Sequence, residues 1–236
     1  VNLRPADIQT TIKEIRPTLM CSVPRFWEKV YAGVQEKIAQ ESGLRKAMML
    51  DALKVGKMHN IDYLRAGKTP PLMLHLKYKF YEKTIYALLK KTIGIENGNF
   101  FPTAGAAVSD EICEFVHSVG INMVVGYGLT ESTATVSCFL DKGYEIGSVG
   151  TVMPDLEVKI GENNEILLRG KTITTGYYKK PEATAAAIDK DGWFHTGDAG
   201  YLKGNHLYLT ERIKDLFKTF ERKGISLRRL WKPNCR

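Results

Sequence analysis

Tyr127-Gly128-Leu129-Thr130-Glu131-Ser132 is the stretch that says most about the fold of this chain. The apolar run from Ile121 to Val125 precedes it and is typical of a strand buried in a sheet. A strand followed by a glycine-containing loop of this kind occurs where open α/β sheets place ligands, outside the carboxyl ends of their strands. The stretch therefore predicts an α/β fold with a binding loop at residues 126–132.

The same loop carries groups that suit a nucleotide. Tyr127 can stack on a base, Thr130 can bond a phosphate oxygen, and Glu131 can hold a magnesium ion that neutralises phosphate charge. The alternative is a strand-end turn whose threonine and glutamate only cap the next helix. The six residues alone leave both interpretations open.

The segments before the loop predict more of the α/β layer. Residues 99–102 read as a short strand, residues 103–107 as a small-residue turn, and Ser109 to Val119 as a helix capped by Ser109. Residues 8–57 are mostly helical in pattern, with a break at 16–18. We expect Ser22 to cap a helix that has Pro24 in its first turn.

A basic amphipathic helix is predicted from Leu76 to Ile93, where Phe80, Ile85, Leu88 and Leu89 alternate with lysines. Such a helix can lie on a membrane surface. It can equally cover a domain and expose a solvated lysine face, which is the interpretation we favour because such helices are common on soluble domains.

The pattern changes after Asp141 to short strands separated by glycine and asparagine turns, at 156–160, 165–169 and 207–209. This predicts a small antiparallel barrel or sheet appended to the α/β part. Two polar segments accompany it. Residues 192–198 end in a Thr-Gly-Asp turn whose aspartate can accept both hydroxyls of a ribose, and residues 211–215 read as a solvated helix start.

Composition narrows the class of protein. The chain has 236 residues, 44% hydrophobic and 25% charged, as in an ordinary globular protein. It has neither a run of about eighteen apolar residues nor the layout of a signal peptide, so we expect a cytoplasmic location and leave membrane association open. Four widely spaced cysteines without a CxxC pair favour free thiols over disulfides or zinc.

The net charge of +8 raises the question of a nucleic-acid partner. Residues 221–236 contribute +5 of it, which leaves +3 for the first 220 residues. Because the excess lies mostly in the C-terminal segment, we expect no nucleic-acid partner.

The order and spacing of the three polar segments, with Gly105-Ala106-Ala107 upstream, resemble the acyl-adenylate-forming family of acyl-CoA synthetases, peptide-synthetase adenylation domains and beetle luciferases. Within that family, Arg16-Pro17-Thr18 followed by Ser22-Val23-Pro24-Arg25-Phe26-Trp27-Glu28-Lys29 is most similar to long-chain fatty acid–CoA ligases. The resemblance runs from about Leu3 to Thr219. It implies part of the large AMP-binding domain, an α/β sheet with helices and a small antiparallel β-barrel.

The domain organisation that the resemblance implies has four parts. Residues 1–140 would be a partial α/β AMP-binding subdomain and residues 141–210 a small β subdomain of the same domain. Residues 211–219 would be the hinge to a C-terminal domain, and residues 220–236 a tail unlike the family.

The resemblance also implies the reaction and its partners: ATP, Mg²⁺ and coenzyme A acting on a long-chain fatty acid, with peripheral membrane contact left open. The site residues that it implies are Gly105 and Ala106 at the adenine, Tyr127 stacked on the adenine, Thr130 at the α-phosphate, Glu131 on magnesium, Asp198 and Arg212 at the ribose, Lys214 as the hinge, and Gly126 and Leu129 beside the acyl tunnel.

Two devices of the family have no counterpart in this sequence: the phosphate loop rich in glycine, serine and threonine that should precede Leu3, and the C-terminal domain with its lysine. The tail also departs from the family. A change of reading frame within codons for Ile225 to Cys235 would restore the family continuation Ile-Ala-Pro-Gln, so we interpret residues 220–236 as out of frame. The alternative to an active ligase is thus an inactive truncated or frameshifted product with at most weak nucleotide binding.

Overall fold

A computed structural model describes residues 7–212 and shows an α/β fold, as predicted. One eight-stranded mixed sheet runs in the order β1-β2-β3-β4-β8-β7-β6-β5. Its strands are β1 (Phe101–Thr103), β2 (Met123–Tyr127), β3 (Ser137–Cys138), β4 (Thr151–Val152), β5 (Leu156–Ile160), β6 (Glu165–Gly170), β7 (Phe194–Lys203) and β8 (His206–Arg212).

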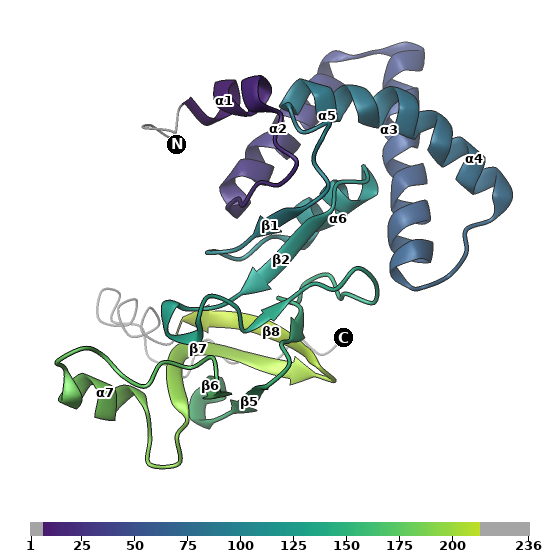
Figure 1. The fold of residues 1–236 in the computed structure, drawn as a ribbon. Helices are drawn as coiled ribbons and strands as arrows, with labels where there is room; N and C mark the ends of the chain where they lie inside the picture. The colour runs from purple at the N-terminus through teal and green to yellow at the C-terminus, as the bar shows by residue number, and fades with distance from the viewer. Residues whose placement is uncertain (1–6, 213–236) are drawn as a thin grey trace, which may run out of the picture.

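Helices α1 to α6 gather around the β1–β2 end of the sheet, while β5 to β8 form the opposite end, where α7 also lies (Figure 1). The helices are α1 (Ile8–Ile15), α2 (Pro24–Gln40), α3 (Gly43–Gly56), the π-helix η2 (Lys57–Arg65), α4 (Leu72–Tyr81), the π-helix η3 (Glu82–Tyr86), α5 (Ala87–Ile93), α6 (Asp110–Ser118), the 3₁₀ turns η4 (Thr130–Ser132) and η5 (Glu162–Asn164), and α7 (Pro181–Ala187).

Strands β1 and β2 are parallel, with Thr103 opposite Val125, and α6 connects them. The side chain of Ser109 caps α6 by accepting a hydrogen bond from the backbone N–H of Ile112, as predicted. Every later pairing in the sheet is antiparallel. The β part is therefore a continuation of the same sheet.

The expected cap at the start of α2 is wrong. The residue before the helix is Val23, and no side chain caps it. The hydroxyl of Ser22 instead lies 2.9 Å from that of Thr103 on β1 and accepts a hydrogen bond of 2.9 Å from Nε1 of Trp27. Ser22 thus holds the helix against the sheet because its hydroxyl has a tertiary partner that outcompetes the local backbone.

Two boundaries in the β part also differ from prediction. Asp198 lies inside the ten-residue strand β7 and not in a turn. Strand β8 continues to Arg212, so residues 211–212 do not start a helix. Pairing between β7 and β8 places Asp198 opposite Arg212, and this long-range ladder overrides the local turn pattern.

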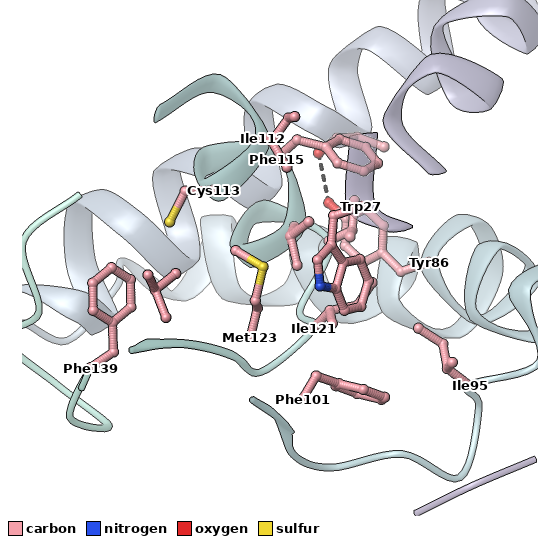
Figure 2. Close-up of a cluster of buried hydrophobic side chains, with 14 of the residues drawn as sticks. Trp27, Tyr86, Ile95, Phe101, Ile112, Cys113, Phe115, Ile121, Met123 and Phe139 are labelled. Atoms are coloured by element: carbon pink, nitrogen blue, oxygen red, sulfur yellow. Dashed lines mark hydrogen bonds between the residues drawn. The ribbon is translucent and has the colours of Figure 1, made fainter. Parts of the chain in front are cut away.

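Two clusters of buried apolar side chains form the core. Trp27, Phe101, Met123 and Val116 belong to the first, where helices pack on β1 and β2. Figure 2 shows Trp27 above Phe101, and the two rings meet edge to face with centroids 5.7 Å apart. The second cluster lies in the β part and includes Tyr127 at the end of β2. Strand β2 thus contributes to both clusters.

Candidate nucleotide site

Tyr127 and Asp198 meet at the carboxyl end of β2. The hydroxyl of Tyr127 donates a hydrogen bond of 2.7 Å to Oδ2 of Asp198, although the two residues are 71 positions apart. Both are buried, with 8% and 7% of their surfaces exposed. Two residues that the sequence assigned to one site are therefore in direct contact.

Asp198 is held in place by its neighbours on β6 and β7. The backbone N–H of Gly197 donates to Oε1 of Glu165 at 2.9 Å, and the N–H of Asp198 donates to the hydroxyl of Thr196 at 3.1 Å. That hydroxyl in turn donates to the carbonyl of Ile166 at 2.7 Å. Gly197 has a φ of 71°, which suits glycine. The hydrogen bond to Glu165 therefore stabilises the positive-φ conformation of Gly197 and so orients Asp198.

The loop after β2 is shaped by Gly128 and Ser132. A Cβ added to Gly128 would lie 1.7 Å from the carbonyl oxygen of Ala134, so no side chain fits there. The buried hydroxyl of Ser132 accepts from the backbone N–H of Leu129 at 3.0 Å. These two residues close a tight turn that leaves Thr130 exposed and Glu131 partly exposed.

Glu131 is attached to the segment that precedes α7. Its Oε1 accepts a hydrogen bond of 2.8 Å from the hydroxyl of Tyr177, and its carbonyl accepts one of 2.7 Å from the N–H of Thr174. The hydrogen bond to the Glu131 carboxylate is the main reason why the pKa of Tyr177 is raised. The structure thus orients this carboxylate through a residue that sequence reasoning missed.

Gly105 and Ala106 follow β1 in an exposed loop. Because β1 and β2 are parallel, this loop leaves the sheet at the same edge as Tyr127. Gly105 has a φ of 91°, and the space around it is open on the side where a Cβ would point. The start of the loop is anchored by Thr103, whose hydroxyl accepts a hydrogen bond of 2.9 Å from Trp27.

The structure thus groups most of the predicted site residues at one edge of the sheet. It places the backbone of Arg212 beside Asp198 and describes only the backbone there. Lys214 and the tail from 220 to 236 lie outside the described residues. Glu165 and Tyr177, the two positioning residues that sequence reasoning missed, carried no local signal because each acts on a segment more than thirty positions away.

Residues 1–178 match the sequence profile of AMP-binding enzymes. The chain belongs to the AMP-binding enzyme family. Two curated relatives of this AMP-binding chain are the long-chain-fatty-acid–CoA ligase ACSBG2 of Mus musculus and the putative fatty-acid–CoA ligase fadD11 of Mycobacterium tuberculosis. The first is 29% identical over 222 residues, covering 92% of this chain and 33% of the relative. The second is 31% identical over 222 residues, covering 93% and 38%.

The AMP-binding chain therefore spans about a third of the length of the curated relatives it matches. A solved structure with a similar fold is O-succinylbenzoate coenzyme A synthetase of Bacillus subtilis in complex with ATP and magnesium ion. It has a TM-score of 0.55 and 16% sequence identity, over 91% of this chain and 35% of that one. At this identity the likeness supports the AMP-binding fold alone.

Between residues 7 and 212, no cluster of three or more His, Cys, Asp or Glu side chains is arranged to hold a metal ion. Over the same residues, none of the helices is both long and apolar enough to cross a membrane.

Proposed function

We propose that this chain carries the nucleotide site of an AMP-forming long-chain fatty acid–CoA ligase. In that reaction the fatty acid carboxylate attacks the α-phosphorus of ATP and pyrophosphate leaves. The thiol of coenzyme A then displaces AMP from the acyl-adenylate. The observation that carries the proposal is the Tyr127–Asp198 pair at the carboxyl end of β2, where α/β sheets bind ligands.

The proposed roles are those that the family resemblance implies, and the places of the residues in the fold support them. Asp198 accepts hydrogen bonds from the ribose hydroxyls, and Arg212 on the neighbouring strand donates to the ribose. Tyr127 offers its ring to the adenine, and the exposed backbone at Gly105 and Ala106 lines the other side. Thr130, exposed on the loop after β2, contacts the α-phosphate.

Glu131 fits the role of a magnesium ligand. Proteins usually hold Mg²⁺ with one or two carboxylates, and substrate phosphates and water complete the shell, so a larger cluster is not required. Glu131 is partly exposed and oriented by Tyr177, at the edge where the phosphates would lie. When bound, the ion would shield the two anions that must approach each other.

Equilibrium binding of AMP to the 236-residue chain tests the proposed site. Replacing Asp198 with Asn removes a charged acceptor for the ribose, and we expect affinity to fall about tenfold or more. Asp62→Asn, at an exposed position on η2, is the matched control and should bind as the unsubstituted chain does. Equal affinities for the two variants would refute the ribose role of Asp198.

The acid substrate is tested by ATP–pyrophosphate exchange that depends on added acid. We expect a gene product extended upstream of Val1 to catalyse this exchange with a long-chain fatty acid and to show little exchange with O-succinylbenzoate. We choose a long-chain fatty acid because the curated relatives are named fatty-acid–CoA ligases. We choose O-succinylbenzoate for comparison because the solved structure of similar fold is named for that acid. Stronger exchange with O-succinylbenzoate would reject the fatty acid.

A non-catalytic protein that binds nucleotide weakly is the second candidate, favoured because the buried Asp198 carboxylate already accepts a hydrogen bond from Tyr127. It predicts that the 236-residue chain alone binds AMP weakly and shows no exchange with any acid. We expect this result for the chain as given. Exchange at a rate comparable with that of the upstream-extended product would exclude a non-catalytic chain.

A further inference from the structure

The segment between β6 and α7 is attached to the loop after β2 at three points (Figure 1). The hydroxyl of Thr133 donates to the carbonyl of Thr172 at 2.7 Å. The N–H of Thr174 donates to the carbonyl of Glu131, also at 2.7 Å. The third contact is the hydrogen bond of 2.8 Å from the Tyr177 hydroxyl to Oε1 of Glu131. Because the first two contacts already join the segments, the third acts mainly on the carboxylate.

The position of Tyr177 itself is fixed by α7. Its N–H donates to the hydroxyl of Thr184 at 2.9 Å, and that hydroxyl donates to the carbonyl of Lys180 at 3.0 Å. Gly176 permits this close approach, since a Cβ there would lie 2.7 Å from Cγ2 of Thr184. The main chain therefore places the Tyr177 ring, and the phenol hydroxyl is directed to Glu131.

The two carboxylate oxygens of Glu131 have different surroundings. Oε1 accepts the hydrogen bond from Tyr177, whereas Oε2 accepts none from any group between residues 7 and 212. Within that part of the chain, no lysine, arginine or histidine forms an ion pair with Glu131. The side chain is partly exposed. Glu131 thus offers one uncommitted oxygen to a cation.

Magnesium and calcium ions make different demands on a carboxylate. Mg²⁺ requires octahedral ligands at about 2.0–2.1 Å and keeps several of its waters. Ca²⁺ takes about six to eight oxygens at about 2.3–2.6 Å, and often both oxygens of one carboxylate. A carboxylate that offers a single oxygen therefore suits Mg²⁺ better than Ca²⁺.

We propose that Tyr177 is a positioning residue that determines the metal preference of the site. Its hydroxyl occupies Oε1 of Glu131, so the carboxylate offers only Oε2, and the site prefers Mg²⁺ to Ca²⁺. This inference rests on the proposed role of Glu131 as a magnesium ligand. Tyr177 acts through that carboxylate alone.

Equilibrium binding of ATP to the 236-residue chain tests the inference, with excess Mg²⁺, excess Ca²⁺ or EDTA present. For the unsubstituted chain we expect the affinity with Mg²⁺ to exceed that with Ca²⁺ by about fivefold or more. Tyr177→Phe keeps the ring and frees Oε1. It should bring the two affinities within about twofold, mainly by tightening binding with Ca²⁺. A residue with a merely structural role would weaken binding with both ions by the same factor.

Tyr178→Phe is the matched control, because Tyr178 is the next residue along the chain and is 85% exposed. It should keep the preference for Mg²⁺. Glu131→Gln removes the carboxylate, so its affinity for ATP should be the same with either ion as in EDTA. Thermal unfolding of each variant checks that it is folded.

An unchanged preference for Mg²⁺ in the Tyr177→Phe variant would overturn the inference, as would equal affinities with the two ions in the unsubstituted chain. If Glu131→Gln still depends on Mg²⁺, or if neither ion improves ATP binding over EDTA, the metal role of Glu131 is wrong and this inference fails with it. AMP binding in EDTA tests Asp198 separately. Failure of the Tyr177 effect alone therefore leaves the proposed function untouched.

Discussion

Tyr127 supplies a hydrogen bond to a carboxylate that is almost fully buried. Tyr127→Phe keeps the ring and removes this donor, so we expect the free energy of unfolding to fall by about 1–3 kcal/mol. Urea denaturation measures it. Tyr201→Phe, at a half-exposed position on β7, should change stability by less than about 0.5 kcal/mol. A similar loss in both variants would contradict a specific role for the hydroxyl.

His117 and His59 are buried imidazoles that favour the neutral form. Burial lowers the pKa of His117 to about 4 from its ordinary value of 6.5, and Arg65 adds to the effect. Burial also lowers the pKa of His59. The unfolded chain binds protons on these two histidines more tightly than the folded chain does. The stabilisation that depends on their neutral forms is therefore fully present above pH 6.5 and is lost as the pH falls toward their pKa values in the fold.

The contribution of His117 can be isolated by substitution. Between pH 6.5 and about 4, the lowered pKa of His117 should reduce the free energy of unfolding by about 1.4 kcal/mol for each unit by which the pH falls. His117→Phe removes this titration, so its free energy of unfolding should vary less steeply with pH over that range. His206→Phe, at a partly exposed position on β8, is the comparison. If the two variants show the same slope, His117 is protonated in the fold as easily as outside it.

At this scale the sequence predicted which residues gather but not how they contact one another. Tyr127 and Asp198 were both named from their motifs, and the structure places them in contact. Their mutual hydrogen bond depends on strands β2 and β7, which are far apart in sequence. The hydrogen bonds that Glu165 and Tyr177 make to the site also join segments that are far apart in sequence. No local pattern around either residue predicts them.

Among the elements, the loop after β2 depends on one glycine. Gly128→Ala would place a Cβ 1.7 Å from the Ala134 carbonyl oxygen, so the loop must move and stability should fall by about 2 kcal/mol or more. Gly33→Ala in the middle of α2 meets nothing within 4 Å. It should be neutral or stabilise by up to about 1 kcal/mol. Thermal unfolding that ranks them in the opposite order would refute this steric account.

The attachment of α2 to β1 depends on the indole of Trp27. Its Nε1 donates to the hydroxyls of Ser22 and Thr103, both at 2.9 Å. Trp27→Phe removes the donor and some volume, and should cost about 2–4 kcal/mol. A double-mutant cycle with Ser22→Ala should give a coupling energy of about 0.5–1.5 kcal/mol. A coupling near zero would mean that packing alone joins the helix to the sheet.

Element types were largely predictable and their ends were not. The helix after Ser109 and the strands at 156–160 and 165–170 appear where apolar periodicity and turn residues indicated them. The π-helical segments η2 and η3 were missed because a local widening of a helix leaves the apolar pattern nearly unchanged. Strand β7 was missed because its glycines and polar residues resemble a turn until a partner strand pairs with them.

Across the whole molecule, β2 connects the two core clusters. Met123 and Val125 belong to the first cluster, and Tyr127, two residues further on the same face, belongs to the second. We therefore expect both parts to unfold together. Variants that keep only Trp27 or only Trp193 as the fluorescent probe should give the same urea midpoint. Two separate midpoints would show that the clusters are independent.

The hydrogen bond between Tyr127 and Asp198 also bears on how the site would distinguish ribose from deoxyribose. Sites reject an analogue that lacks a hydroxyl most strongly when the protein group meant for it is left buried and unpaired. Here the Asp198 carboxylate already has a partner within the fold before any nucleotide arrives. An AMP analogue without a ribose hydroxyl would leave that partner in place. Deoxyadenosine monophosphate should therefore bind only modestly more weakly than AMP.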